Sequence, residues 1–526
     1  MKKNTIAKAV LGAAALCGAV SLNAQTLYDG MTVAGTGLSG TSRFVGMGGA
    51  MGALGGDISV MGTNPAGIGL FRSNEISASM GLSVYANESN YLSKRFDNHK
   101  TKFAFDQVGA VFSTRMGDRS ALRFMNLGFN YHRSKPLFKN MEMGGLLGEQ
   151  SQSFQMAAQA TGIENWGDAK NRLDDPKLGW LSILGYEAFV INPVSGKVGQ
   201  FTGLEGGSQA SFGLKERGGI DQFDANVSFN WYDRFYFGVT LGAYAVDYTK
   251  YTFYSESLAN GEGYLMESWN AMEGAGFDLK LGAILRPVET SPFRLGLAIH
   301  TPTFYNLKYR TSAFIQSELK DKAGAMQQTK VYTPDRLGGG DMVRAFRMRT
   351  PWVFQLSVGH VLGRSLALGA EYEYKDYASI RMRDEFGSAE AYEFENHDAS
   401  TMLKGVHTWR VGAEYKVLPK LALRAGYNHQ TAAYKTNAVK YLTDNSIQTD
   451  TDFANVKAVN NYTLGIGYRG SSFYADLAYQ LSTYQSDFYP FLNVEKKNNV
   501  TEYITPEATR LKDNRNHVSL TLGWRF

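Results

Sequence analysis

The stretch QFDANVSFNW, residues 222–231, alternates without a break between polar and apolar side chains. Its odd-numbered positions are all apolar and its even-numbered positions are all polar. Because successive side chains of a β-strand point to opposite faces of the sheet, this period of two predicts a strand with one apolar face. The same alternation recurs at 277–286, 366–375 and 421–428.

Fourteen segments of this kind follow one another, and the connections between them are alternately short and long. Short turns on one side and long loops on the other are typical of an outer-membrane barrel, with the short turns in the periplasm. We therefore predict an all-β chain that closes into a 14-stranded antiparallel transmembrane β-barrel, because closure removes the unpaired sheet edges. The predicted strands are 75–87, 103–114, 121–133, 220–231, 234–250, 273–286, 292–306, 351–362, 365–377, 405–417, 420–431, 459–469, 472–484 and 515–526.

Residues 1–24 have the composition of a cleaved signal peptide. Lys2, Lys3 and Lys8 precede an apolar run from Ala9 to Val20, and Leu22-Asn23-Ala24 before Gln25 is the predicted cleavage site. Removal of this segment leaves 51 basic and 49 acidic residues of the 54 and 49 in the full chain, with no basic stripe that would suit nucleic acid. The only cysteine, Cys17, lies in the same segment, so the mature chain has no disulfide. We expect an exported protein that is located in a Gram-negative outer membrane.

Residues 25–74 precede the first strand and show no long alternation. They are rich in Gly, Met and Ala, which allow close backbone approach and adaptable packing inside a narrow space. RFVGMGGA at 43–50, GGD at 55–57 and NPAGIG at 64–69 resemble the N-terminal hatch of the FadL/TodX family of long-chain fatty acid and hydrocarbon transporters. We therefore interpret 25–74 as a hatch that plugs a barrel formed by 75–526.

The resemblance implies a monomer without a cofactor or metal, embedded in outer-membrane lipid. Such a protein takes up hydrophobic small molecules by passive diffusion, through a hatch-gated pocket and a lateral opening at a kinked third strand. Gly128 in the third predicted strand is the candidate kink, with an ordinary lumen-facing glycine as the alternative. The hatch residues that the resemblance places at the ligand are Phe44, Met47, Met51, Asn64, Pro65, Ala66, Gly67, Leu70 and Phe71.

The long loop at 134–219 contains a predicted helix between Asp175-Pro176 and Pro193. This helix is apolar almost all round, so it needs a partner. One hypothesis is that it captures a hydrophobic ligand at the cell surface, and the alternative is that it packs against other extracellular loops. The candidate capture residues are Trp180, Leu181, Leu184 and Phe189.

Other motifs do not support a different function. GTGLSG at 35–40 lacks the flanking strand and helix of a dinucleotide site, and Asp450-Thr451-Asp452 lacks the glycine and glutamate of a calcium loop. No nucleophile signature is present, so we expect no enzymatic activity, although a hydrolase built on the barrel rim would leave no local motif. The alternative functions are a FadL-like scaffold or shuttle of a protein-secretion system and a plugged porin. Haem import is a further alternative, but the sequence offers no pair of histidines that would serve as axial ligands.

Overall fold

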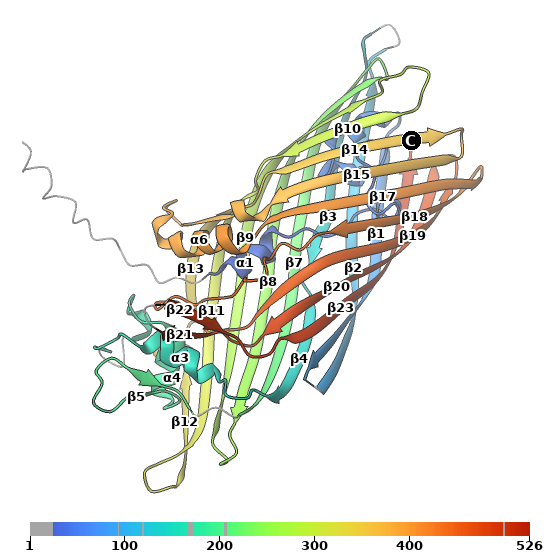
Figure 1. Ribbon diagram of the computed structural model, residues 1–526. Coiled ribbons are helices and arrows are strands. Elements are labelled where there is room, and N and C mark those ends of the chain that lie inside the picture. Colours follow the sequence, from blue (N-terminus) through green and yellow to red (C-terminus); the bar gives the residue numbers. More distant parts are fainter. Residues whose placement is uncertain (1–24, 93, 118–119, 167–171, 205–207, 498–499) are drawn as a thin grey trace, which may run out of the picture.

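The computed structural model describes residues 25–92, 94–117, 120–166, 172–204, 208–497 and 500–526, so the predicted signal peptide lies outside the described residues. These residues form a closed antiparallel barrel with fourteen wall positions (Figure 1). No helix in the described ranges is long and apolar enough to cross a membrane. The wall consists of β1 (Glu75–Tyr91), β2 (Lys94–Arg115), β3 (Leu122–Pro136), β7 (Gln209–Trp231), β8 (Phe235–Ser257), β9 (Gly263–Leu285), β10 (Arg294–His300) with β11 (Phe304–Lys320), β14 (Val353–Leu362) with β13 (Met342–Arg349), β15 (Leu366–Asp376), β17 (Gly405–Leu418), β18 (Leu421–Gln430), β19 (Phe453–Arg469), β20 (Phe473–Tyr489) and β23 (Thr509–Arg525).

The first and last wall strands close the barrel. β1 pairs with β23 over sixteen residue pairs, from Glu75 opposite Arg525 to Asn90 opposite Arg510. The outward faces carry the predicted apolar side chains, including the exposed Phe223, Leu241 and Leu281, while the inward positions between them are buried and largely polar. The predicted all-β barrel is therefore confirmed, with hydrocarbon-facing residues on the outside of a polar wall.

Several wall strands are longer or more broken than the sequence predicts. The predicted loop 88–102 is mostly strand, because β1 runs to Tyr91 and β2 begins at Lys94. Most of the predicted loop 251–272 is likewise the β8–β9 hairpin. Above the apolar band both faces of these strands meet water or other loops, so the alternation that marks a strand in the sequence disappears there.

The long connections carry all the helices outside the hatch, at the barrel end opposite the carboxyl terminus (Figure 1). The predicted helix in the loop 134–219 is present but shorter than expected, and the sequence did not predict the other helices. The loop elements are β4 (Lys139–Leu146), α3 (Gln152–Ala160), η3 (Arg172–Asp174), α4 (Trp180–Glu187), β5 (Asn192–Pro193), β6 (Phe201–Thr202), β12 (Met326–Tyr332), α5 (Thr333–Arg336), η4 (Tyr377–Ser379), β16 (Arg381–Asp384), η5 (Glu390–Tyr392), α6 (Glu393–Met402), β21 (Asn493–Lys497) and β22 (Val500–Ile504).

Residues 25–74 lie inside the barrel as four short helices that bond to the wall. They are α1 (Leu27–Ala34), α2 (Ser42–Gly46), η1 (Ile58–Gly62) and η2 (Pro65–Leu70). The backbone N–H of Ser42 donates to Thr521 on β23 at 2.7 Å. On the other side of the lumen, Ser228 on β7 donates to the carbonyl of Pro65 at 2.8 Å. Residues 41–74, here called the lower hatch, are thus bonded to two separate strands of the wall, β23 and β7.

A chain of buried charges ties α2 to the wall. Arg43 donates to Glu414 on β17 at 2.9 Å, and Arg424 on β18 donates to the same carboxylate at 2.6 Å. Arg424 also reaches Asp476 on β20 at 2.7 Å. Because removing one partner would leave the others buried and uncompensated, such a network holds the hatch in a single position.

Wall glycines let the hatch backbone come close to the strands. A Cβ at Gly412 would lie 2.3 Å from the carbonyl oxygen of Met47, and one at Gly426 would lie 2.2 Å from the amide nitrogen of Gly48. Gly369 and Gly238 meet the backbone of Ala50 and Pro65 in the same way. Any side chain at these positions would displace the hatch, because the atoms that it meets belong to the backbone.

We predict that Gly412→Val or Gly426→Val loosens the hatch, at a cost of about 1–3 kcal/mol or more from overpacking. In planar bilayers, either variant should conduct ions well above the level of the unmodified protein. Gly213→Val on β7 is the matched control, because its added Cβ meets nothing within 4 Å. Equal conductance in all the variants would contradict the tight hatch contact.

Candidate functional site

A cavity of about 560 Å³ lies in the lumen between the hatch and the extracellular loops. Residues 28–39 of the hatch, here called the upper hatch, form one wall of the cavity, and Phe44, Ser59 and Thr63 form part of its floor. The remaining lining comes from inward-facing residues of the barrel strands. This volume falls within the range of small-molecule sites.

The cavity has an apolar side and a polar side. Val33, Ala34, Leu137 and Ile220 line the apolar side and belong to one buried hydrophobic cluster. On the polar side, Lys280 lies 3.2 Å from Asp224 and 2.8 Å from Asp278. Other polar lining groups also have partners, as His300 Nε2 lies 2.7 Å from the carbonyl oxygen of Thr63. A ligand with an apolar chain would therefore fit against the first side.

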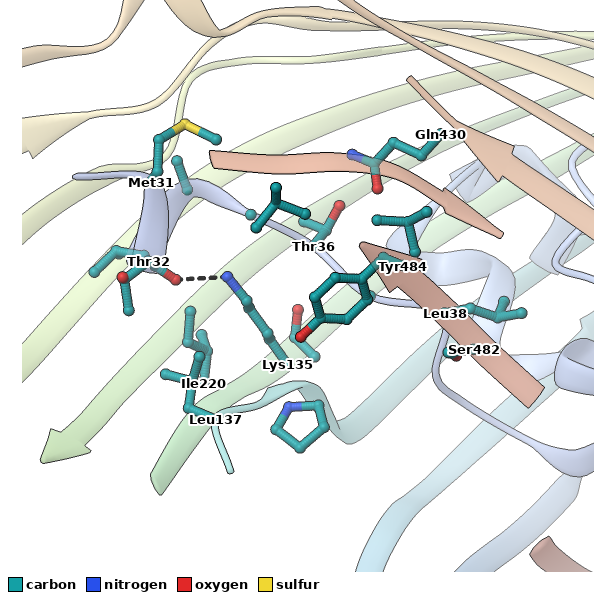
Figure 2. A pocket seen from close by; sticks show the side chains of 18 of the residues that line it. Met31, Thr32, Thr36, Leu38, Lys135, Leu137, Ile220, Gln430, Ser482 and Tyr484 are labelled. Atoms are coloured by element: carbon teal, nitrogen blue, oxygen red, sulfur yellow. Dashed lines mark hydrogen bonds between the residues drawn. The ribbon is translucent and has the colours of Figure 1, made fainter. Parts of the chain in front are cut away.

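Lys135 brings a cation to the apolar side. Its Nζ donates to the backbone carbonyl of Thr32 at 2.8 Å, beside Leu137 and Ile220 (Figure 2). Among the ion pairs of the described residues, none includes Lys135, whereas the neighbouring Lys139 is paired with Asp513 at 2.9 Å. The half-buried ammonium of Lys135 is thus available to an acidic group that enters the cavity.

Next to the cavity, the ladder between the second and third wall strands is interrupted, and this interruption is here called the slit. The β2–β3 ladder runs from Arg115 opposite Phe124 to Gln107 opposite His132. Above it, the described residues 94–105 of β2 pair with β1, while β4 continues β3 and pairs with β7. Side chains still bridge this region, because Ser89 and Tyr91 on β1 donate to carbonyl oxygens of β4. The cavity is lined from both sides of this slit, by residues 98–100 and 102 of β2 and by residues 134–141.

Phe138 occupies the slit at the break between β3 and β4. Its ring lies 5.8 Å from the ring of Tyr85 on β1, and the Nζ of Lys102 on β2 lies 4.8 Å from its centroid. Lys100 and Arg515 add further basic groups to the lining near the slit. Phe138 therefore packs against Tyr85 and Lys102, which both line the cavity.

Most of the predicted hatch residues lie below the cavity. Phe44 lines the cavity, but the other eight candidates do not. Met47, Met51 and Phe71 belong to the buried core of the hatch, and Asn64 donates to the carbonyl oxygens of Gly52 and Ala283. Pro65, Ala66, Gly67 and Leu70 lie in η2, which packs against β7, β8 and β9.

The other candidate positions also differ from their expected roles. The ladder between β3 and β7 passes through Gly128 without a register shift. Its register shifts lie at Leu122–Phe124 and Arg133–Lys135, so the third wall strand is interrupted there and not at Gly128. Trp180, Leu181 and Leu184 are completely buried among other loops, which favours the packing alternative for this helix. Phe189 lies just beyond α4 and is 59% exposed.

Lys135 and Phe138 were missed by the sequence analysis. Both follow the third predicted strand, in a region where the alternation had already ended. The only local signal is Pro136, because a proline cannot donate to a sheet ladder and favours an edge or a bulge. Among the described residues, no cluster of three or more His, Cys, Asp or Glu side chains is placed to hold a metal ion.

α6 covers the extracellular side of the upper hatch. Ala399 and Met402 belong to the same hydrophobic cluster as Leu27 of α1, and the hydroxyl of Tyr392 donates to Gln25. Burial raises the pKa of Glu395 on this helix to about 7. Burial also raises the pKa of Asp398 to about 6. The packing of α6 against α1 therefore places two carboxyl groups where their charged forms are disfavoured.

No family model and no curated protein matches the sequence. A crystal structure of a Pseudomonas aeruginosa FadL homologue aligns with a TM-score of 0.50 and 14% identity, covering 93% of this chain and 99% of that chain. The Pseudomonas putida toluene transporter TodX and the Ralstonia pickettii toluene transporter TbuX align with TM-scores of 0.47 and 0.45, identities of 11% and 12%, and the same coverage. The first similarity confirms the predicted fold, a closed 14-stranded barrel of the FadL type.

We predict that α6 is held most tightly in acid. A carboxyl group whose pKa is raised by folding does not destabilise the folded state while it is protonated. As pH rises from about 4.5 to about 7, the folded state loses stability, by at most about 3 kcal/mol for Glu395. Amide exchange in α6, corrected for the intrinsic rate, should be slower at pH 5 than at pH 8. Glu395→Gln should weaken this dependence and Glu393→Gln, at an exposed position, should not. Equal protection at both pH values would contradict the prediction.

Proposed function

We propose that this protein is an outer-membrane channel that takes up hydrophobic small molecules by passive diffusion. The observation that carries the proposal is the cavity, which is lined by residues of β2 and by residues 134–141 on the two sides of the interrupted β2–β3 ladder. The polar wall and the bonded lower hatch disfavour an apolar ligand below the cavity, whereas the slit leads out at the level where Phe103 and Phe105 face outward. A ligand that leaves through the slit never crosses the polar lumen.

The upper hatch is the part that we propose to move. Residues below Gly40 in the lumen are fixed by Arg43, the wall glycines and η2. The upper hatch is held by single hydrogen bonds, which include those from Lys135 to Thr32, from Gln448 to Asp29 and from Lys375 to Thr36. Movement of α1 would enlarge the cavity on its apolar side without breaking the charge network around Glu414. The gate would then consist of the upper hatch on one side and Phe138 on the other.

The ligand that fits best is an amphipathic acid, such as a long-chain fatty acid. Its alkyl chain would lie against the apolar side of the cavity, where each buried methylene contributes about 0.8 kcal/mol. Its carboxylate would accept from Lys135, in place of the carbonyl of Thr32. A neutral hydrocarbon would use the same apolar surface but leave this ammonium on its backbone partner.

The lateral route can be tested by closing the slit. We expect Lys102→Cys with Phe138→Cys, joined by a short bis-maleimide reagent, to reduce ligand uptake by at least about tenfold, since the linker spans the exit. The only native cysteine, Cys17, lies in the predicted signal peptide. Once that segment has been removed, the reagent can react only with the two introduced cysteines. Uptake is measured with radiolabelled fatty acid in cells before and after linking.

Phe112→Cys with Leu127→Cys is the matched control, because these residues lie opposite each other in the continuous part of the same two strands. Linking them should leave uptake unchanged. Full uptake through a linked slit would rule out lateral exit and would favour a path past the hatch.

Lys135 can be tested by its effect on acids and on neutral ligands. Lys135→Gln should weaken capture of a long-chain fatty acid about tenfold, since a hydrogen bond to a charged group contributes about 1.5–3 kcal/mol. Capture of the corresponding alcohol should change by no more than about twofold, because it depends on apolar burial. Binding to the purified protein is measured by calorimetry, with Lys330→Gln, an exposed loop position, as control. An equal loss for acid and alcohol would show that Lys135 has a structural role only.

A further inference from the structure

A group of exposed cations lies on three adjacent strand segments, β11, β13 and β16. β11 and β13 reach the loop end of the barrel (Figure 1). β11, β13 and β16 pair side by side, and Arg347 lies opposite both Asn306 and Arg383. The sequence neighbours Phe346, Met348 and Met382 are buried, so the cationic side chains point away from the barrel. The exposed cations of this patch are Lys308, Arg310, Arg347, Arg349 and Arg383.

Few carboxylates balance this charge. Arg310 lies 3.6 Å from Glu273 on β9, and both side chains are more than half exposed. Among the ion pairs of the residues that the structure describes, no other includes a member of the patch. Glu385 stands at its edge. The patch therefore carries an excess of positive charge, with most of its guanidinium groups open to an anion.

The patch lies at the outer edge of the apolar band. Below Arg349, the outward positions Trp352, Phe354, Leu356 and Val358 are all exposed and apolar. Arg349 precedes the end of β14 at Leu362 by thirteen residues, which at about 3.3 Å per residue and a tilt of about 40° places it roughly 33 Å above the periplasmic turn. An apolar band is about 25 Å tall, so the cations stand at the level of the outer headgroups.

Two of the five patch cations, Lys308 and Arg347, line a groove of about 490 Å³. The carboxylates of Glu273 and Glu385 and the small residues Gly274 and Ala345 also line it. Guanidinium groups bind phosphate through paired N–H donors, which makes arginine the preferred residue for recognising it. A groove of this size accommodates a phosphorylated sugar rather than a single ion.

We propose that this groove binds the phosphorylated headgroup of an outer-leaflet glycolipid, with its acyl chains against Trp352 and Phe354. Charge complementarity and the position directly above the apolar band both favour a lipid over a soluble anion. The inference rests on the proposed outer-membrane location. It concerns the outside of the barrel and is independent of the ligand in the cavity.

The test uses the full-length protein in detergent and native mass spectrometry. Diphosphoryl lipid A should be retained at least tenfold better than the same lipid after removal of its phosphates. Arg347→Ala with Arg349→Ala should abolish this preference. Arg364→Ala with Lys416→Ala, at exposed positions near the periplasmic turns, should retain it. Equal retention of the two lipids by the unmodified protein would overturn the proposal.

Further measurements distinguish a lipid site from a soluble-anion site and from a folding defect of the variant. Displacement of the lipid by inorganic pyrophosphate at equal concentration would identify a soluble-anion site and overturn the lipid assignment. If the double alanine variant fails to fold, Lys308→Gln with Arg383→Gln should still lower the preference, and an unchanged preference would count against the patch. Fatty acid uptake by the unmodified protein and by the same variants is measured in parallel. Loss of the lipid preference with normal uptake in the variants supports this inference. Normal uptake without any lipid preference in the unmodified protein refutes it and leaves the proposed function intact.

Discussion

Every backbone N–H and C=O group at membrane depth must be paired within the chain, and the ladder between β1 and β23 is what allows this barrel to meet that requirement. Without it, two strands would present unpaired edges to hydrocarbon, at several kcal/mol for each unsatisfied group. The sixteen pairs from Glu75–Arg525 to Asn90–Arg510 remove both edges. Closure also creates a lumen, and the lumen imposes its own requirement, because a polar wall must be filled or hydrated.

The hatch meets this second requirement by backbone contact. Gly412 and Gly426 bring the strands within van der Waals distance of residues 47–48, and the Arg43–Glu414–Arg424 chain satisfies charges that would otherwise face an empty space. The lower lumen is therefore filled by hatch residues that cannot move without leaving buried charges unpaired. The upper lumen is different, because α1 contributes apolar side chains and a few single hydrogen bonds there. The cavity is found where the hatch is least constrained.

Beside the cavity, the pairing of β18 with β19 ends at Gln430 opposite Val459, although β19 begins at Phe453. The slit is a second interruption of the wall ladder. Its lower end coincides with the end of the β2–β3 pairing at Gln107 and His132, near the top of the apolar band. Above this point, two carbonyl groups of β4 that lack a ladder partner on β2 accept hydrogen bonds from the side chains of Ser89 and Tyr91 on β1. The same change of solvent that permits the slit also ends the apolar surface and begins the cationic patch.

The sequence alone determined the strand order, the outward faces and the plugged barrel, because hydrocarbon on one side imposes a period of two that survives in the amino-acid pattern. It also predicted a hatch at 25–74 from the glycines of this segment and from the resemblance carried by the NPAGIG motif. It did not determine which hatch residues face the cavity, since only Phe44 of nine candidates does so, nor that Trp180 is buried rather than available to ligand. Those outcomes, together with the position of Lys135, the break at Phe138 and the gathering of Arg347 beside Arg383, were decided by tertiary structure. They depend on which strands and loops meet above the membrane, where no regular solvent boundary leaves a pattern in the sequence.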